Sequence, residues 1–248
     1  MNWSGISAQS LLGKVLRFPL NFLPPHAQVP IMQGKLRGKN WVVGSSNHGC
    51  WLGSYELDKQ LVFERIVLRG STVFDLGAHV GFYTLLASEL VGPLGKVIAF
   101  EPVPRNLFYL KMHLRLNHVG NVIVKEAAVL DKSGITSFEE ASNSSMGHIT
   151  PQGRLQVQTI ALDNLVLDGG IPMPEYMKID IEGAEFLALA GAKSILAKSH
   201  PTIFLATHGS TVHQACCEFL QTLGYRLQSI DGLNLEQSSE ILATYNAS

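Results

Sequence analysis

Residues 73 to 84 read Val73-Phe74-Asp75-Leu76-Gly77-Ala78-His79-Val80-Gly81-Phe82-Tyr83-Thr84, and this stretch decides the fold of the chain. Its apolar start predicts a short buried strand, and its two glycines predict a turn. The residues after the turn predict an amphipathic helix. An α/β sheet uses this order of strand, turn and helix to present backbone groups to a nucleotide-like ligand. The stretch therefore predicts an α/β domain with a ligand site at the end of its first central strand.

The spacing of the two glycines argues against a dinucleotide at this site. The turn reads G-x-x-x-G, and His79 stands where a G-x-G-x-x-G loop needs a glycine so that pyrophosphate can approach the backbone. Asp75, just before the turn, would repel a pyrophosphate. Both features suit S-adenosylmethionine (SAM), which has no phosphate and carries a cationic amino group and sulfonium.

Two later strands supply further walls for the same site. The buried strand 96–101 ends in Glu101, twenty positions beyond Gly81, which is about the offset at which a strand-end carboxylate accepts hydrogen bonds from ribose hydroxyls. The strand 121–129 ends with Ala127 and Ala128. These small side chains leave room for an adenine ring, or they are ordinary core alanines, and both interpretations stay open.

Acidic and basic side chains also follow the last two buried strands. Asp180 and Glu182 lie at and just after the end of a buried strand that starts at Met177, and His208 ends the strand at 202–208. Because the carboxyl ends of central strands face the ligand crevice, we expect His208 to act as a general base, with Asp180 or Glu182 orienting it or receiving the proton. Glu185 has a simpler role, because an acid is favourable at any helix N-terminus.

A divalent cation is the alternative way to activate an acceptor hydroxyl. Asp180, Glu182 and His208 have the oxygen and nitrogen ligands that such an ion needs. However, Asp180 and Glu182 are too close in the sequence to define a cage. We therefore expect no metal site.

Composition restricts the class of protein. The chain has 248 residues, a net charge of −1 and 46% hydrophobic residues, so a general nucleic-acid partner is not expected. Its three cysteines form neither a disulfide framework nor a metal-ligand spacing, and reduced thiols in a cytoplasmic protein explain them. Four prolines interrupt the uncharged run at 18–34, which argues against a transmembrane segment. Lys14 and Arg17 interrupt the apolar part of a possible signal peptide.

We expect one domain at 44–248 after an N-terminal extension at 1–43. Residues 1–55 hold five basic side chains and no acid, and an amphipathic helix before Pro19 would lie on a membrane surface or cover an apolar patch of its own domain. The segment 131–159 predicts a loop insertion with a small hairpin. In the loop at 44–54, Trp51 and His48 would close over the ligand, or Trp51 would fill the core.

Together these motifs resemble the FkbM family of SAM-dependent methyltransferases. The resemblance rests on residues 75–84, 100–102 and 178–185 and covers roughly residues 48–230. It implies the class I methyltransferase fold, a Rossmann-like three-layer α/β sandwich whose mostly parallel seven-stranded sheet has an antiparallel strand near one edge. It also implies SAM as cofactor and transfer of the methyl group to a hydroxyl of a sugar, polyketide, lipid-linked or other small-molecule acceptor.

The resemblance and the residue arguments together define the expected site. The catalytic candidates are His208, Asp180 and Glu182, and the cofactor-binding candidates are Asp75, Gly77, Ala78, His79, Gly81, Phe82, Tyr83, Thr84, Glu101, Pro102, Asn106, Ala127, Ala128 and Asp180. The chain departs from the family at His79, where Asn is frequent, and at Ala206, where many relatives carry Glu. An N-methyltransferase and a catalytically silent SAM-binding protein are the alternatives. The acceptor's identity and the oligomeric state are not encoded in any of these motifs.

Overall fold

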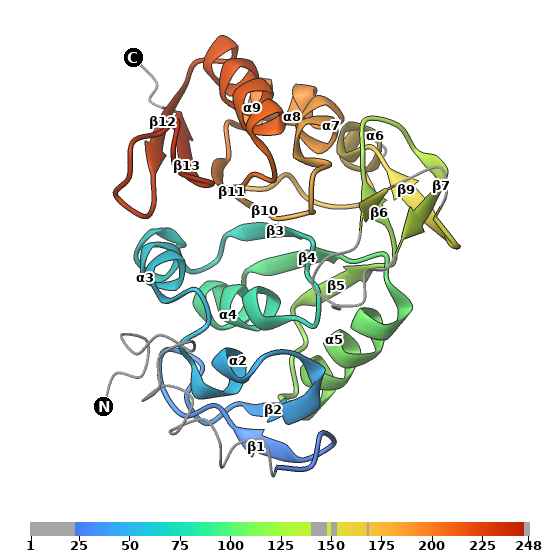
Figure 1. Cartoon of the computed structure of the whole chain (residues 1–248), viewed down its shortest axis with the longest axis vertical. Helices are drawn as coiled ribbons and strands as arrows, with labels where there is room; N and C mark the ends of the chain where they lie inside the picture. Colours follow the sequence, from blue (N-terminus) through green and yellow to red (C-terminus); the bar gives the residue numbers. More distant parts are fainter. Residues whose placement is uncertain (1–22, 140–147, 150–152, 168, 246–248) are drawn as a thin grey trace.

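A seven-stranded sheet forms the centre of the protein (Figure 1). The computed structural model describes residues 23–139, 148–149, 153–167 and 169–245. Across the sheet the strands are β12 (Tyr225–Ser229), β13 (Glu240–Tyr245), β11 (Thr202–Ala206), β10 (Tyr176–Ile179), β3 (Thr72–Leu76), β4 (Lys96–Phe100) and β5 (Val122–Lys125). β13 runs antiparallel to the other six strands, which are parallel to one another. This arrangement confirms the predicted sheet with one antiparallel strand near an edge.

Helices cover both faces of the sheet. One layer contains α3 (Leu57–Ile66), α4 (Phe82–Val91) and α5 (Pro104–Leu116), and the other contains α6 (Leu162–Leu167), α7 (Glu185–Ala190), α8 (Lys193–Ser199) and α9 (Ser210–Thr222). Alternate residues of each strand point to opposite faces, so Val73 joins the α3–α5 core and Phe74 joins the α6–α9 core. The result is the predicted three-layer sandwich.

A small sheet extends from one side of the sandwich. It contains β6 (Ala128–Val129), β9 (Leu155–Ile160), β7 (Gly134–Glu139) and β8 (His148–Ile149) in that order. β7 and β9 pair antiparallel within the segment for which the sequence predicts a hairpin. Phe138 and Val157 form a separate core there with Val103 of the main domain, so this sheet is attached beside the strand ends.

The first described residues pack against the main domain. β1 (Gln28–Pro30) and β2 (Asn40–Val42) form a hairpin, followed by η3 (Val43–Ser45) and α2 (His48–Leu52). Trp41 is fully buried and stacks on His113 of α5, with ring centroids 3.8 Å apart. Trp51 is also buried, and its Nε1 donates to His48 Nδ1, so Trp51 belongs to the core. Residues 23–43 therefore share the core of the domain that follows them.

Two of the N-terminal predictions concern residues that the structure leaves out. The amphipathic helix before Pro19 and residues 1–22 of the extension lie outside the described residues, as does the serine-rich stretch at 142–145. Across the part of the chain that the structure does describe, we find no helix with the length and apolar character that crossing a membrane requires.

Candidate active site

A cavity of about 610 Å³ opens at the carboxyl ends of β3, β4, β10 and β11. This is the edge at which open α/β sheets bind their ligands. Of the predicted site residues, Gly77, Ala78, His79, Phe82, Tyr83, Glu101, Pro102, Asn106, Ala127, Ala128, Asp180, Glu182 and His208 line it. Residues that are more than a hundred positions apart in the sequence thus line the same cavity, as the sequence predicts.

The turn after β3 is held between its two neighbouring strands. Gly77 has a φ of 78°, and a Cβ added there would lie 1.9 Å from the carbonyl oxygen of Asp180. The amides of Gly77 and Ala78 donate to Phe100 O at 3.0 and 2.9 Å. His79 also adopts a left-handed conformation, with a φ of 51°. These contacts fix the position of the turn against the ends of β4 and β10.

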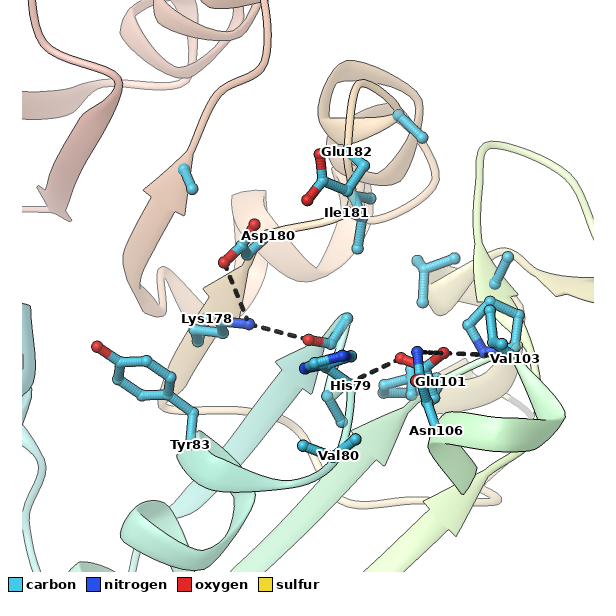
Figure 2. A pocket seen from close by; sticks show the side chains of 18 of the residues that line it. His79, Val80, Tyr83, Glu101, Val103, Asn106, Lys178, Asp180, Ile181 and Glu182 are labelled. Atoms are coloured by element: carbon cyan, nitrogen blue, oxygen red, sulfur yellow. Dashed lines mark hydrogen bonds and ion pairs between the residues drawn. The ribbon is translucent and has the colours of Figure 1, made fainter. Parts of the chain in front are cut away.

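Glu101 connects this turn to the start of α5 (Figure 2). Its carboxylate accepts hydrogen bonds from the backbone amides of His79 at 2.8 Å and Val103 at 2.9 Å, and from Asn106 Nδ2 at 3.2 Å. Glu101 is buried, and burial raises the pKa of its carboxyl, although these hydrogen bonds act in the opposite direction. The three donors hold the carboxylate in one orientation beside the cavity.

Three of the predicted contact residues lie behind the lining of the cavity. Asp75, Gly81 and Thr84 are not among the described residues that line the cavity. Asp75 is buried within β3, where it accepts a hydrogen bond from Thr84 Oγ1 at 2.6 Å and pairs with Lys178 Nζ at 3.5 Å. Lys178 occupies the paired position on β10. Asp75 therefore neutralises a buried lysine behind the wall instead of facing a cationic ligand.

Lys178 connects this buried pair to the cavity. Its ammonium donates to Gly77 O at 3.0 Å and lies 3.7 Å from Asp180 Oδ2, as Figure 2 shows. Burial lowers the pKa of Lys178, but the carboxylates of Asp180 and Asp75 hold it above its ordinary value. Burial likewise raises the pKa of Asp180, while Lys178 and Lys59 bring it below its ordinary value. Both groups are therefore charged at neutral pH.

His208 lies among three carboxylates. Its Nδ1 donates to Glu185 Oε1 at 2.8 Å, while its Nε2 lies 3.5 Å from Glu182 Oε2 and 3.8 Å from Asp180 Oδ1. The hydrogen bond to Glu185 raises the pKa of His208 to about 9, although partial burial opposes this. Burial raises the pKa of the Glu182 carboxyl. At neutral pH, His208 is therefore a cation and a hydrogen-bond donor.

Glu185 has a larger role than the predicted helix cap. It is the first residue of α7 and is fully buried. Its Oε1 accepts hydrogen bonds from the amides of Ile181 and Gly183, at 3.3 and 3.0 Å, as well as from His208. The same carboxylate thus satisfies the backbone before the helix and orients the imidazole from β11.

Sequence reasoning missed Glu56 and Glu240, which line the cavity from outside the motifs, and the buried Lys59 that pairs with both. Lys59 of α3 is buried and pairs with Glu56 at 3.0 Å, with Glu240 at 2.8 Å and, more distantly, with Asp180 at 3.9 Å. Glu240 pairs with Ala206 in the sheet register, so β13 supplies a carboxylate beside the position where many relatives carry Glu. A cation inside an apolar pattern marks Lys178, but no local signal identifies Glu240.

The family model described as the Methyltransferase FkbM domain matches residues 75–227. The chain belongs to the FkbM methyltransferase family. The matched range contains the glycine turn, Glu101, Asp180, Glu182 and His208. Membership in the FkbM family confirms the resemblance on which the predicted fold and site depend.

One curated relative of this FkbM family member is the hexuronic acid methyltransferase AglP of Haloferax volcanii. The two sequences are 29% identical over 126 residues, which are 50% of this chain and 51% of AglP. The chain thus matches about half the length of this curated relative.

Two solved structures share the fold. Methyltransferase FkbM from Methylobacillus flagellatus KT aligns with a TM-score of 0.54 and 19% identity, over 71% of this chain and 43% of that one. The ribosomal protein L11 methylase from Lactobacillus delbrueckii subsp. bulgaricus aligns with a TM-score of 0.50 and 12% identity, over 81% of each chain. These similarities show that the FkbM domain here has the class I methyltransferase fold.

Proposed function

We propose that this protein transfers a methyl group from SAM to a hydroxyl oxygen of a small-molecule acceptor, with a sugar as the favoured acceptor class. One observation carries the proposal: Glu101 is fixed by the amides of His79 and Val103 at the end of β4, beside the glycine turn. A strand-end carboxylate in this position accepts hydrogen bonds from the two hydroxyls of a ribose. FkbM membership supports methyl transfer as the reaction.

The residues around the cavity fit the parts of SAM. Glu101 would hold the ribose, and Ala127 and Ala128 leave space for the adenine. Asp180 lines the cavity where Asp75 does not, so Asp180 would be the carboxylate that favours the cationic end of the cofactor. When bound, SAM supplies an electrophilic methyl group on a sulfonium, and methyl transfer then requires the acceptor oxygen to lie in line with that bond.

The proton of the acceptor hydroxyl goes to a carboxylate in this mechanism. His208, with a pKa of about 9, already carries a proton at neutral pH and is therefore a poor base. Glu182 lies beside it, half-buried, and its raised pKa makes it a better proton acceptor. The charged His208 stabilises the Glu182 and Asp180 carboxylates until transfer. The predicted base thus becomes a positioning group, and Glu182 receives the proton.

The curated relative and the residues that line the cavity both support a sugar as the acceptor class. AglP is named for methylation of a hexuronic acid, which is a sugar with several hydroxyls. Two carboxylates that line the cavity, those of Glu182 and Glu240, are hydrogen-bond acceptors suited to hydroxyl groups. Hydroxyl acceptors built on a polyketide or on a lipid-linked sugar satisfy the same chemistry.

Calorimetry followed by methyl transfer tests the function. The full chain is titrated with SAM and, separately, with NAD; we expect saturable binding of SAM alone, and failure to bind SAM would refute the proposal. Labelled SAM is then supplied with a uronic acid glycoside, a neutral glycoside and a primary amine. Label in a sugar ether supports O-methylation, whereas label only in the amine identifies an N-methyltransferase.

A variant tests the role of Glu182. Glu182→Gln should lower kcat on a hydroxyl acceptor about 100-fold or more while SAM affinity is retained, because general-base assistance is worth roughly that factor. Glu64→Gln, an acid of α3 that does not line the cavity, serves as the control. Equal kcat for E182Q and the unmodified protein would exclude Glu182 as the base.

A further inference from the structure

Three side chains at the end of the cavity bring one possible metal ligand each into a small volume. An oxygen of Asp180, an oxygen of Glu182 and a nitrogen of His208 all lie within 4.8 Å of one another. The separations of 3.5 and 3.8 Å from His208 Nε2 are long for hydrogen bonds. Ligands about 2.1 Å from a common ion lie roughly 3.0 to 3.4 Å apart, so a small inward movement would complete a metal shell.

The backbone removes the objection that Asp180 and Glu182 are too close in the sequence. Glu182 has a φ of 55°, a left-handed conformation that is uncommon outside glycine. This turn allows the carboxylates of Asp180 and Glu182 to approach the same point from a short segment. His208 reaches that point from the end of β11, the strand next to β10, so the three groups come from two elements of the sheet.

Glu185 prepares the imidazole for a ligand on its other nitrogen. Metal-binding histidines usually donate their second N–H to a carboxylate or carbonyl, which fixes the ring and its tautomer. Here His208 Nδ1 donates to the fully buried Glu185, so Nε2 is the nitrogen that faces Asp180 and Glu182. The other oxygen of Glu185, Oε2, is buried without a hydrogen-bond partner among the described residues.

The charges around the site provide an independent argument for a bound cation. A continuous ion-pair network joins six carboxylates to two lysines and one histidine; its members are Glu56, Asp75, Asp180, Glu182, Glu185, Glu240, Lys59, Lys178 and His208. Negative charge therefore exceeds positive charge in a partly buried region, which is unfavourable without a further cation. Both lysines lie nearer to Asp180 Oδ2, while Oδ1 is the oxygen nearest His208.

From this geometry we infer that Asp180, Glu182 and His208 bind one divalent metal ion, which displaces the Nε2 proton that His208 carries in the metal-free protein. Two carboxylate oxygens and one imidazole nitrogen suit Mn²⁺ among the common ions, and the cavity leaves the remaining positions for water or an acceptor oxygen. Its role rests on the proposed function: the ion would bind the acceptor hydroxyl and make its proton more acidic. Because Glu182 offers one oxygen to the ion, its other oxygen remains available to receive the proton.

Electron paramagnetic resonance tests the site without SAM or acceptor. The full chain is freed of metals with a chelator, Mn²⁺ is added near pH 8 so that it competes with fewer protons, and the signal of free Mn²⁺ is followed. We expect one Mn²⁺ per chain with a Kd below about 1 mM. His208→Gln and Glu182→Gln should each weaken binding about 10-fold or more, and Glu185→Gln about 10- to 100-fold.

His213→Gln is the matched control, since His213 lies on α9 and is not among the described residues that line the cavity. Its Mn²⁺ affinity should equal that of the unmodified protein, and circular dichroism should show that each variant is folded. If H208Q does not fold, the Mn²⁺ affinity of E182Q still shows whether losing a proposed metal ligand weakens binding. The absence of binding at about 1 mM, or binding that survives in both E182Q and H208Q, would overturn the inference. Mn²⁺ binding without SAM binding would refute the proposed function but leave the metal site intact.

Discussion

At the scale of single residues, Glu101 holds the fold together and, in the proposed function, also binds a ligand. Each of its oxygens already accepts at least one hydrogen bond from the protein, from His79 on one side and from Val103 and Asn106 on the other. A carboxylate has about four acceptor positions, so it can still accept hydrogen bonds from a ribose. Its surroundings therefore orient it without using its full capacity.

Replacing this carboxylate should selectively weaken cofactor binding. Glu101→Gln substitutes donor hydrogens for one acceptor and removes the charge, so we expect SAM affinity to fall about 10- to 100-fold, the equivalent of one or two charge-assisted hydrogen bonds. Calorimetric titration measures the change, and Glu126→Gln, an exposed acid paired with Lys111, is the control. An unaltered SAM Kd in a folded E101Q protein would show that Glu101 does not contact the cofactor.

At the scale of elements, the turn between β3 and α4 depends on the close approach of β10. The backbone of Gly77 passes so near Asp180 that no side chain fits, and Lys178 fastens the two strands by donating to Gly77 O. The turn, Asp180 and Lys178 therefore form one rigid unit. A change in this turn should alter both the cofactor site and the position of Asp180.

A pair of glycine substitutions separates this packing effect from backbone strain. Gly77 and Gly70 have similar φ values of 78° and 83°, but a Cβ at Gly70 would meet nothing within 4 Å. We expect Gly70→Ala to lower the free energy of unfolding by about 1 to 2 kcal/mol. Gly77→Ala should lower it by about 2 kcal/mol more, because the methyl group meets backbone that cannot move freely. Urea unfolding measures both, and equal losses would contradict the role given to β10.

At the scale of the whole molecule, the N-terminal hairpin is attached through a buried histidine. His113 of α5 accepts a hydrogen bond from the amide of Val42 at 3.1 Å and donates to Val80 O at 2.7 Å, while its ring stacks on Trp41. These contacts require the neutral imidazole. They connect residues 23–43 both to the helix layer and to the glycine turn that follows β3.

This arrangement predicts that stability decreases in mild acid. Burial lowers the pKa of His113 from 6.5 to about 4, so the unfolded chain binds a proton more readily than the folded one. The free energy of unfolding should therefore fall as the pH falls from about 6.5 to about 4, by about 3 kcal/mol from this group. Urea titrations at several pH values measure the slope. In His113→Gln the slope over this window should be smaller, and an identical slope would exclude His113 as its source.

Several predictions about the whole chain remain predictions. These include the domain boundary near residue 44, contact of the basic extension with a membrane surface, cytoplasmic location and the absence of a nucleic-acid partner. Trp41 packs on His113, so the residues around it belong to the core. A truncation that removes the extension should stop before residue 23, since a longer one would expose the core.

The amino-acid sequence by itself determined the features that depend on neighbours along the chain. Apolar runs define the strands, and the G-x-x-x-G turn and the acids at 101 and 180 mark residues that line the cavity. These features can be read from the sequence because periodicity and turn chemistry are local properties. Family resemblance then supplied the seven-stranded, mostly parallel sheet with one antiparallel strand near an edge.

Only the tertiary structure decided which charged groups form ion pairs and shift one another's pKa values. Lys59 and Glu240 are 181 positions apart and meet because β13 inserts between β11 and β12. The same packing turns Asp75 toward Lys178 and places Glu185 against His208, so the predicted base is a cation at neutral pH. Burial and electrostatic interactions depend on distances in space, and sequence spacing does not specify those distances.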